Sequence, residues 1–380
     1  MKISIFCVAL VIIPLCLSAE VVHIPDANLE RVLREAMQLD SSDRITVQHM
    51  AELRVLNAQN QGIKELSGLE YATNLTELRL GENSIRDIRP LAHLTQLSFL
   101  RLNDCWTIDD ISPLANLTQL TVLDLDRNLI LDIGPLAGLT ALESSDIRYN
   151  QIENLSPIAN LMHLTALHLG GNPIEDIGPL ANLTQLTFLR LNDNQLIENI
   201  GSLANLTQLR VVHLDRNAIV DISPLAGLTA LASLDIRYNQ IENLSPLANL
   251  TQLTQLFLNN NKIVDISPLA HLTQLTELYL DGNQIEDISP LENLTQLTRL
   301  LLNNNRIVDV NPLAKLTRLD FLDIRHNKLP DYTTLDELSL SQFFYDQTCN
   351  MPPLPLEPRL ENRNYPSIFA RWSGFGWPPY

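Results

Sequence analysis

The chain contains 380 residues, 75 of them leucine, and 44 acidic residues against 26 basic ones give a formal net charge of −18. The leucine share is roughly twice that of an average soluble protein, and so many evenly spread apolar residues exclude a disordered chain. The negative charge argues against a protein that mainly binds nucleic acid phosphates. A mean hydropathy near zero, with one long apolar run, excludes a polytopic membrane protein.

Residues 1–19 have the pattern of a secretory signal peptide. Lys2 precedes an apolar run over residues 3–17, and small residues follow for cleavage before Glu20. Two alternatives stay open, a lipoprotein modified at Cys16 and an uncleaved membrane anchor, although the residue before the cysteine is larger than lipoprotein signals normally allow. We expect a secreted or cell-surface protein without stable membrane insertion after cleavage.

Residues 20–52 are predicted to be helical. Apolar residues recur at helical spacing within 24–37 and fall on one face, and a second short apolar pattern follows. These residues are Leu29, Val32, Leu33, Ala36 and Met37 in the first pattern and Val47, Met50 and Leu53 in the second.

Residues 53–330 repeat a leucine-rich pattern every 22 residues, with two units of 23. The segment L-x-L alternates buried and outward positions, which predicts a short strand, and such strands stack as a parallel sheet. A period of this length indicates a solenoid, so the domain count from length does not apply. The first apolar residue of the pair, or its substitute, falls at 56, 78, 100, 123, 145, 167, 189, 212, 234, 256, 278, 300 and 322, which gives thirteen units.

The rest of each unit predicts a turn and a short helix. An asparagine, such as Asn261, follows the strand where the chain must turn, because an amide side chain can bond exposed backbone groups. Ser267 and Pro268 are interpreted as the N-cap and first residue of one helical turn. We therefore expect short 3₁₀ or α turns on the convex side, with aspartates such as Asp265 and Asp287 as turn formers.

This pattern resembles the 22-residue bacterial leucine-rich repeat of the internalin family, over nearly three quarters of the chain. The resemblance implies an α/β solenoid: a leucine-rich repeat horseshoe with a concave parallel β-sheet, short 3₁₀ or α turns on the convex side and a helical N-terminal cap at 20–52. It also implies function by protein recognition on the concave face.

Residues 93–180 and 182–269 are copies of each other, offset by 89 positions. The offset places Cys105 in the slot of Asn194, so we interpret this cysteine as structural rather than as a metal or redox group. Ser145 occupies the slot of Leu234, where a buried serine loses apolar burial worth about 1–3 kcal/mol.

The outward residues between the paired leucines predict where a partner binds. A polar, mixed-charge first half gives way to three apolar residues on neighbouring strands, which we expect to be exposed and to form a hot spot. The alternative is a row of solvent-facing positions with no ligand. The candidate partner-binding residues are Phe257, Tyr279, Leu301, Arg190, His213 and Asp235.

A cation site is a weaker possibility. Asp124, Asp146 and His168 lie on consecutive predicted strands, and this set of residue types also arises easily by chance in such a column. The sequence contains no phosphate-binding loop, H-E-x-x-H motif or nucleophile elbow. It therefore predicts neither catalysis nor a cofactor.

The period ends near Pro330. Residues 331–350 are expected to form a helical or irregular C-terminal cap, and residues 351–380 a proline-rich linker and aromatic tail. Nine of the 20 aromatic residues fall within 343–380.

The favoured function is a secreted or surface, non-catalytic, monomeric scaffold that binds a protein partner and no nucleic acid. One alternative is the targeting module of a larger secreted enzyme. Another is an intracellular regulatory subunit of the phosphatase-binding type, which the predicted signal peptide opposes.

Overall fold

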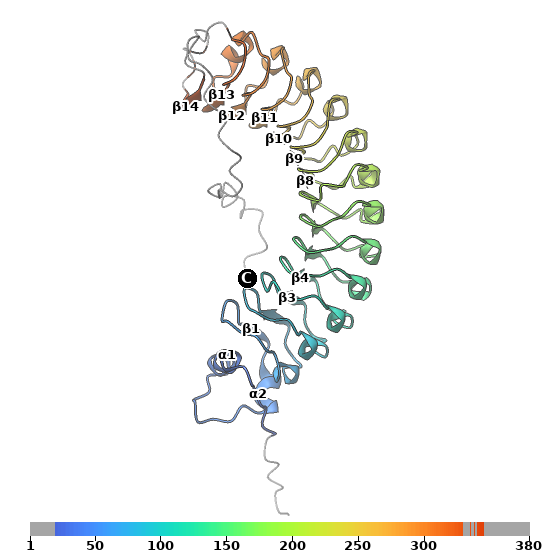
Figure 1. The fold of residues 1–380 in the computed structure, drawn as a ribbon, viewed down its shortest axis with the longest axis vertical. Coiled ribbons are helices and arrows are strands. Elements are labelled where there is room, and N and C mark those ends of the chain that lie inside the picture. The colour runs from blue at the N-terminus through green and yellow to red at the C-terminus, as the bar shows by residue number, and fades with distance from the viewer. Residues whose placement is uncertain (1–19, 330–334, 336–337, 339, 346–380) are drawn as a thin grey trace, which may run out of the picture. The chain divides into compact units, whose positions relative to one another are not determined.

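A computed structural model describes residues 20–329, 335, 338 and 340–345. They form one stack of coils, with strands along the inner side of its arc and short helical turns along the outer side (Figure 1). The predicted signal peptide at 1–19, the tail at 351–380 and most of the predicted cap at 331–350 lie outside the described residues. Among the described residues, no helix is long and apolar enough to cross a membrane.

A single parallel sheet runs through the stack, and its strands follow one another in sequence order. Each strand is three residues long. The strands are β1 (Val55–Asn57), β2 (Glu77–Arg79), β3 (Phe99–Arg101), β4 (Val122–Asp124), β5 (Ser144–Asp146), β6 (Ala166–His168), β7 (Phe188–Arg190), β8 (Val211–His213), β9 (Ser233–Asp235), β10 (Gln255–Phe257), β11 (Glu277–Tyr279), β12 (Arg299–Leu301), β13 (Phe321–Asp323) and β14 (Gln342–Phe344).

The predicted repeat register is confirmed. The thirteen positions from 56 to 322 are the central residues of β1 to β13. Each central side chain points into the core, as Leu256 does with an exposed fraction of 0%, while its neighbours Gln255 and Phe257 are half-buried on the opposite face. This alternation is the period of two that a half-buried strand requires. The solenoid and its concave sheet therefore follow from the leucine spacing.

The turn asparagines close each coil with side-chain hydrogen bonds. Asn239 donates from Nδ2 to the carbonyl oxygens of Leu214, at 3.0 Å, and Ile236, at 3.1 Å, and its Oδ1 accepts from the backbone of Ile219 at 3.0 Å. One amide thus satisfies backbone groups of two neighbouring coils. The same pattern recurs at most turn asparagines, which makes them a buried polar ladder beside the leucine core.

The outer side carries 3₁₀ turns, as predicted. Their starts differ in one detail: Ser267 is the first residue of its turn, not the N-cap, which is Ile266. Asp265 provides the polar contact instead, since its Oδ1 accepts from the Ser267 N–H at 2.8 Å. The turns are η1 (Leu69–Tyr71), η2 (Arg89–Leu91), η3 (Ser112–Leu114), η4 (Gly134–Gly138), η5 (Ser156–Ile158), η6 (Gly178–Asn182), η7 (Gly201–Asn205), η8 (Ser223–Leu225), η9 (Ser245–Leu247), η10 (Ser267–Leu269), η11 (Ser289–Leu291) and η12 (Asn311–Lys315).

Two helices cover the N-terminal end of the core. Helix α1 (Ala27–Met37) begins at the N-cap Asp26, whose side chain accepts two backbone N–H groups, and buries Leu29, Val32 and Leu33. Helix α2 (Val47–Glu52) buries Met50. These residues join the leucine core, so the helical N-terminal cap is confirmed.

The C-terminal end differs from a purely helical or irregular cap. Strand β14 adds a further parallel strand next to β13, with Leu322 opposite Phe343. The buried Leu335, exposed by only 3%, joins the core before it. Because β14 lies outside the 22-residue pattern, the leucine spacing alone gave no signal for it.

Candidate functional site

The six predicted partner-binding residues lie in one unbroken row on the concave face. They come from six consecutive strands, β7 to β12, and each is the register partner of the next. In chain order they are Arg190, His213, Asp235, Phe257, Tyr279 and Leu301. Parallel strands lie about 4.8 Å apart, so neighbouring side chains in this row are in contact range.

The three apolar residues of the row are half-buried, which corrects the expectation that they are exposed. Phe257 and Tyr279 pack edge to face with ring centroids 4.7 Å apart, and Arg237 lies over the Phe257 ring at 5.8 Å. The Tyr279 hydroxyl lies 3.4 Å from Arg299. Side chains on adjacent strands cover part of one another, so the row offers a packed apolar strip with polar edges.

Asp235 is more deeply placed than a free contact residue. Its exposed fraction is 3%. The Arg237 side chain forms a two-point ion pair with it, from Nε to Oδ1 at 2.9 Å and from Nη2 to Oδ2 at 2.7 Å. Arg237 also reaches toward Asp215, with Nη2 at 4.0 Å from Oδ2. Asp235 therefore helps to hold Arg237 in place on the concave face.

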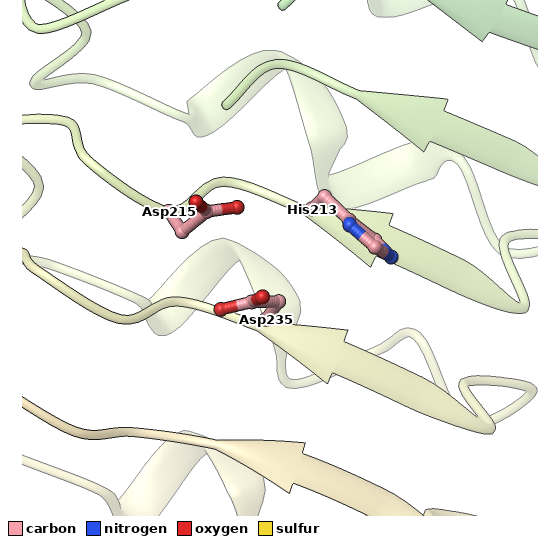
Figure 2. A group of neighbouring side chains, drawn as sticks. All are labelled: His213, Asp215 and Asp235. Atoms are coloured by element: carbon pink, nitrogen blue, oxygen red, sulfur yellow. The ribbon is translucent and has the colours of Figure 1, made fainter. Parts of the chain in front are cut away.

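A group of possible metal ligands centres on the same strands. One ligand atom each from His213, Asp215 and Asp235 lie within 4.8 Å of one another, and among the described residues no other such group of three forms. Figure 2 shows the Asp215 and Asp235 carboxylates facing each other, with the His213 ring beside them. Sequence reasoning did not select Asp215, because it follows the strand rather than lying in the predicted column.

The set predicted from sequence, Asp124, Asp146 and His168, does not come together in this way. His168 Nδ1 lies 4.0 Å from Asp146 Oδ2, but ligand atoms of all three residues do not come within 4.8 Å of one another. The ligand group that does form lies in the second copy. Its three residues correspond to Asp124, Asp126 and Asp146 of the first copy. A search that included the residue after each strand, such as Asp215, as well as the strand residues could have found this ligand group from the sequence.

The electrostatics of the two copies are alike. Burial and the nearby Asp235 raise the pKa of Asp215 to about 7, with Arg237 opposing, and burial with Asp146 raises the pKa of its counterpart Asp126 to about 6, with Arg148 opposing. The pKa of His213 is lowered to about 3 by removal from water, then by Arg190 and Arg237. The His213 imidazole is therefore neutral at physiological pH and can act as a ligand.

Comparisons with known proteins give the class. The family model for leucine-rich repeats (2 copies) matches residues 73–116, 163–205, 184–227, 207–249, 251–293 and 295–340. The protein is thus a leucine-rich repeat protein. Among curated proteins, none matches the chain.

Solved structures narrow the class further. An internalin from Listeria monocytogenes, InlF, is 40% identical, with a TM-score of 0.83 over 86% of this chain and 96% of that one. The chain belongs to the internalin family. The functional domain of InlJ from Listeria monocytogenes shares the fold at 23% identity, with a TM-score of 0.63 over 83% of this chain and 77% of that one.

A more distant plant protein has the same fold. The ectodomain of the receptor kinase GASSHO1/SCHENGEN3 from Arabidopsis thaliana, solved in complex with CASPARIAN STRIP INTEGRITY FACTOR 2, is 22% identical. Its TM-score is 0.56 over 75% of this chain and 43% of that one.

Proposed function

We propose that the protein is a non-catalytic scaffold that binds a protein partner through the concave surface of β7 to β12. The observation that carries this proposal is the unbroken row of six side chains, in which an aromatic and apolar strip adjoins a charged stretch. Aromatic residues and arginine supply most of the energy at protein interfaces. A curved sheet offers these groups to a partner as one continuous surface.

The apolar half of the row is the expected anchor. Phe257 and Tyr279 already pack on each other, so a partner would meet a pre-organised surface and lose little side-chain entropy on binding. Arg237 and Arg299 flank the rings and offer hydrogen-bond donors to partner carboxylates or carbonyl groups.

The test is capture of surface-exposed proteins by the purified chain and two triple variants. Phe257→Ser, Tyr279→Ser and Leu301→Ser together should abolish recovery of the partner, a loss of at least tenfold, because the anchor is gone. The matched control replaces Val220, Val264 and Val308, which are exposed by 57%, 57% and 53% off the concave strands, and should bind as the native chain does.

Circular dichroism decides whether a loss of binding is meaningful. Both triple variants should keep the native spectrum, because the central strand leucines stay in place. A partner retained by the concave variant and lost by the valine variant would contradict the proposal. A hydrolase screen of the same purified chain should be negative, and robust turnover would contradict a non-catalytic role.

Export completes the proposal. The n-region, apolar run and small residues of 1–19 support secretion or surface display, although these residues lie outside the described part of the chain. We propose that the exported protein is a monomer. N-terminal sequencing of protein recovered from the medium should begin at Glu20. Recovery of the uncleaved chain from cytosol would overturn this part of the proposal.

A further inference from the structure

We propose that His213, Asp215 and Asp235 form a binding site for a divalent transition-metal cation, for which zinc is the best-fitting ion. One ligand atom from each residue lies within 4.8 Å of the others. Zinc sits about 2.0–2.2 Å from nitrogen and oxygen ligands, which places ligand atoms about 3–4 Å apart. Zinc binding would therefore draw the three ligand atoms about 1–2 Å closer together.

The donor set selects the class of ion. A neutral imidazole with two carboxylates suits zinc and its neighbours among the transition metals, whereas magnesium and calcium prefer oxygen ligands throughout. The His213 ring nitrogens form no hydrogen bond with any residue in the described part of the chain; the ring's aromatic neighbour Phe188 lies 6.1 Å away between centroids. The nitrogen lone pair is therefore available to a metal.

One buried polar atom that has no hydrogen-bond partner among the described residues lies on β9, which also carries Asp235. Asp215 is exposed by only 7%, and the nearest cation to its carboxylate, Arg237, is 4.0 Å away. Ser233 is exposed by 3%, and its hydroxyl has no hydrogen-bond partner within the described residues. Ser233 precedes Asp235 by two residues, so strand alternation places it on the same face of β9. Buried polar groups without partners indicate a place for an ion or for ordered water.

Arg237 does not block the site. Asp235 Oδ1 accepts from the backbone N–H and the Nε–H of Arg237, and Oδ2 accepts from Nη2. A carboxylate offers about four lone-pair positions, so one on Oδ2 remains. Asp235 can therefore keep Arg237 and still provide a metal ligand.

The first copy provides an internal control. Asp124, Asp126 and Asp146 stand where His213, Asp215 and Asp235 stand in the second copy. The first copy has Asp124 where the second has His213, and therefore lacks the nitrogen ligand. Strand β4 forms with this aspartate, so the replacement is compatible with the fold. His213→Asp thus converts the second site to the first, and Asp124→His converts the first to the second.

The experiment is isothermal titration of zinc chloride into the full purified chain at pH 7.5. The native chain should bind one equivalent at this site, His213→Asp should weaken that binding at least tenfold, and Asp124→His should add a second equivalent. Asp215→Asn is a second loss variant in case His213→Asp fails to fold.

Two results would overturn the proposal: no zinc binding by the native chain, or binding that neither His213→Asp nor Asp215→Asn weakens. The measurement contains no protein partner, so its failure leaves the proposed recognition function standing. Conversely, a chain that binds zinc but recovers no partner would refute the recognition function alone.

Discussion

The two copies within the solenoid, residues 93–180 and 182–269, present nearly the same concave surface. In the first three coils, the two outward residues of each strand and the two residues after the second leucine are identical at eleven of twelve positions. The first copy's twelve are Phe99, Arg101, Asn103, Asp104, Val122, Asp124, Asp126, Arg127, Ser144, Asp146, Arg148 and Tyr149. The exception is Asp124, which is replaced by His213.

Matching contacts show that the copies share a geometry as well as a sequence. Arg148 and Arg237 each bind their aspartate at 2.7 Å, and Arg127 and Arg216 lie over Tyr149 and Tyr238 at 5.1 and 4.9 Å. The concave face of this block is thus built twice.

The fourth coil is where the copies part. His168 in the first copy gives way to Phe257 in the second, and Ala166 gives way to Gln255. This exchange begins the apolar strip that continues through Tyr279. The comparison teaches that both copies carry the same charged framework, while the apolar strip begins only in the fourth coil of the second copy.

The largest expected effect on stability comes from placing a serine at the centre of β9, as the first copy has at Ser145. Leu234 is fully buried at the centre of β9, and Leu234→Ser removes its apolar contacts and buries a hydroxyl without a partner, as at Ser145. The free energy of unfolding should fall by about 3–5 kcal/mol. Urea unfolding followed by circular dichroism measures this change in the free energy of unfolding. A change below about 1 kcal/mol would show that the core tolerates the loss of the leucine side chain at position 234.

The reverse exchange should stabilise the chain. Ser145 is exposed by 2% and lies between Leu123 and Leu167 on the neighbouring strands. Ser145→Leu should raise the free energy of unfolding by about 1–3 kcal/mol through apolar burial. Ser144→Leu, on the opposite face of the same strand, is the matched control and should not stabilise. A destabilised Ser145→Leu variant would mean that the first copy has closed around the smaller side chain.

The smallest effect concerns pH. Asp215 faces Asp235 and Arg237 from β9 and Asp193 from the coil of β7, and its pKa is raised from 3.8 to about 7. A carboxyl group whose pKa is higher in the folded than in the unfolded chain contributes stability that is fully present below pH 3.8. That contribution is lost as the pH rises toward 7. Asp215→Asn should therefore be neutral near pH 4 and stabilising above pH 7, on the order of 1 kcal/mol.

Asp126 in the first copy sharpens this test. Its pKa is raised to about 6 by burial and Asp146, against Arg148 and Arg127, so the Asp126→Asn effect should reach its plateau about one pH unit earlier. Melting temperatures across pH 4–8 measure both variants. Equal effects of Asp215→Asn at pH 4 and pH 7.5 would contradict a raised pKa.

The fold could be predicted almost completely, because each repeat places the same residue types at the same spacing. The positions from Leu56 to Leu322 mark the centre of every strand from β1 to β13, including those where Ser145 and Val212 replace leucine, since only one register buries the leucines. Strand β14 could not be predicted, because Gln342–Phe344 carry no leucine pair and join the sheet by backbone pairing with β13.

The candidate site could be predicted only in part. The row from Arg190 to Leu301 follows from strand alternation, but how deeply each side chain lies depends on its neighbours in space. Asp235 is buried because Arg237 folds over it, and Asp215 enters the ligand group from the turn after β8. Neither relation is a property of the strand pattern, so the pattern did not select Asp215 for a ligand group.

The central claim, that the row on β7 to β12 meets a protein partner, is tested most directly by site-specific photo-cross-linking. A photoreactive phenylalanine analogue would replace Tyr279 on the concave face or Val264, which is exposed by 57% off the strands. The account predicts a discrete protein adduct from position 279 on illumination with surface-exposed proteins, and none from position 264. An adduct from position 264 alone would contradict it.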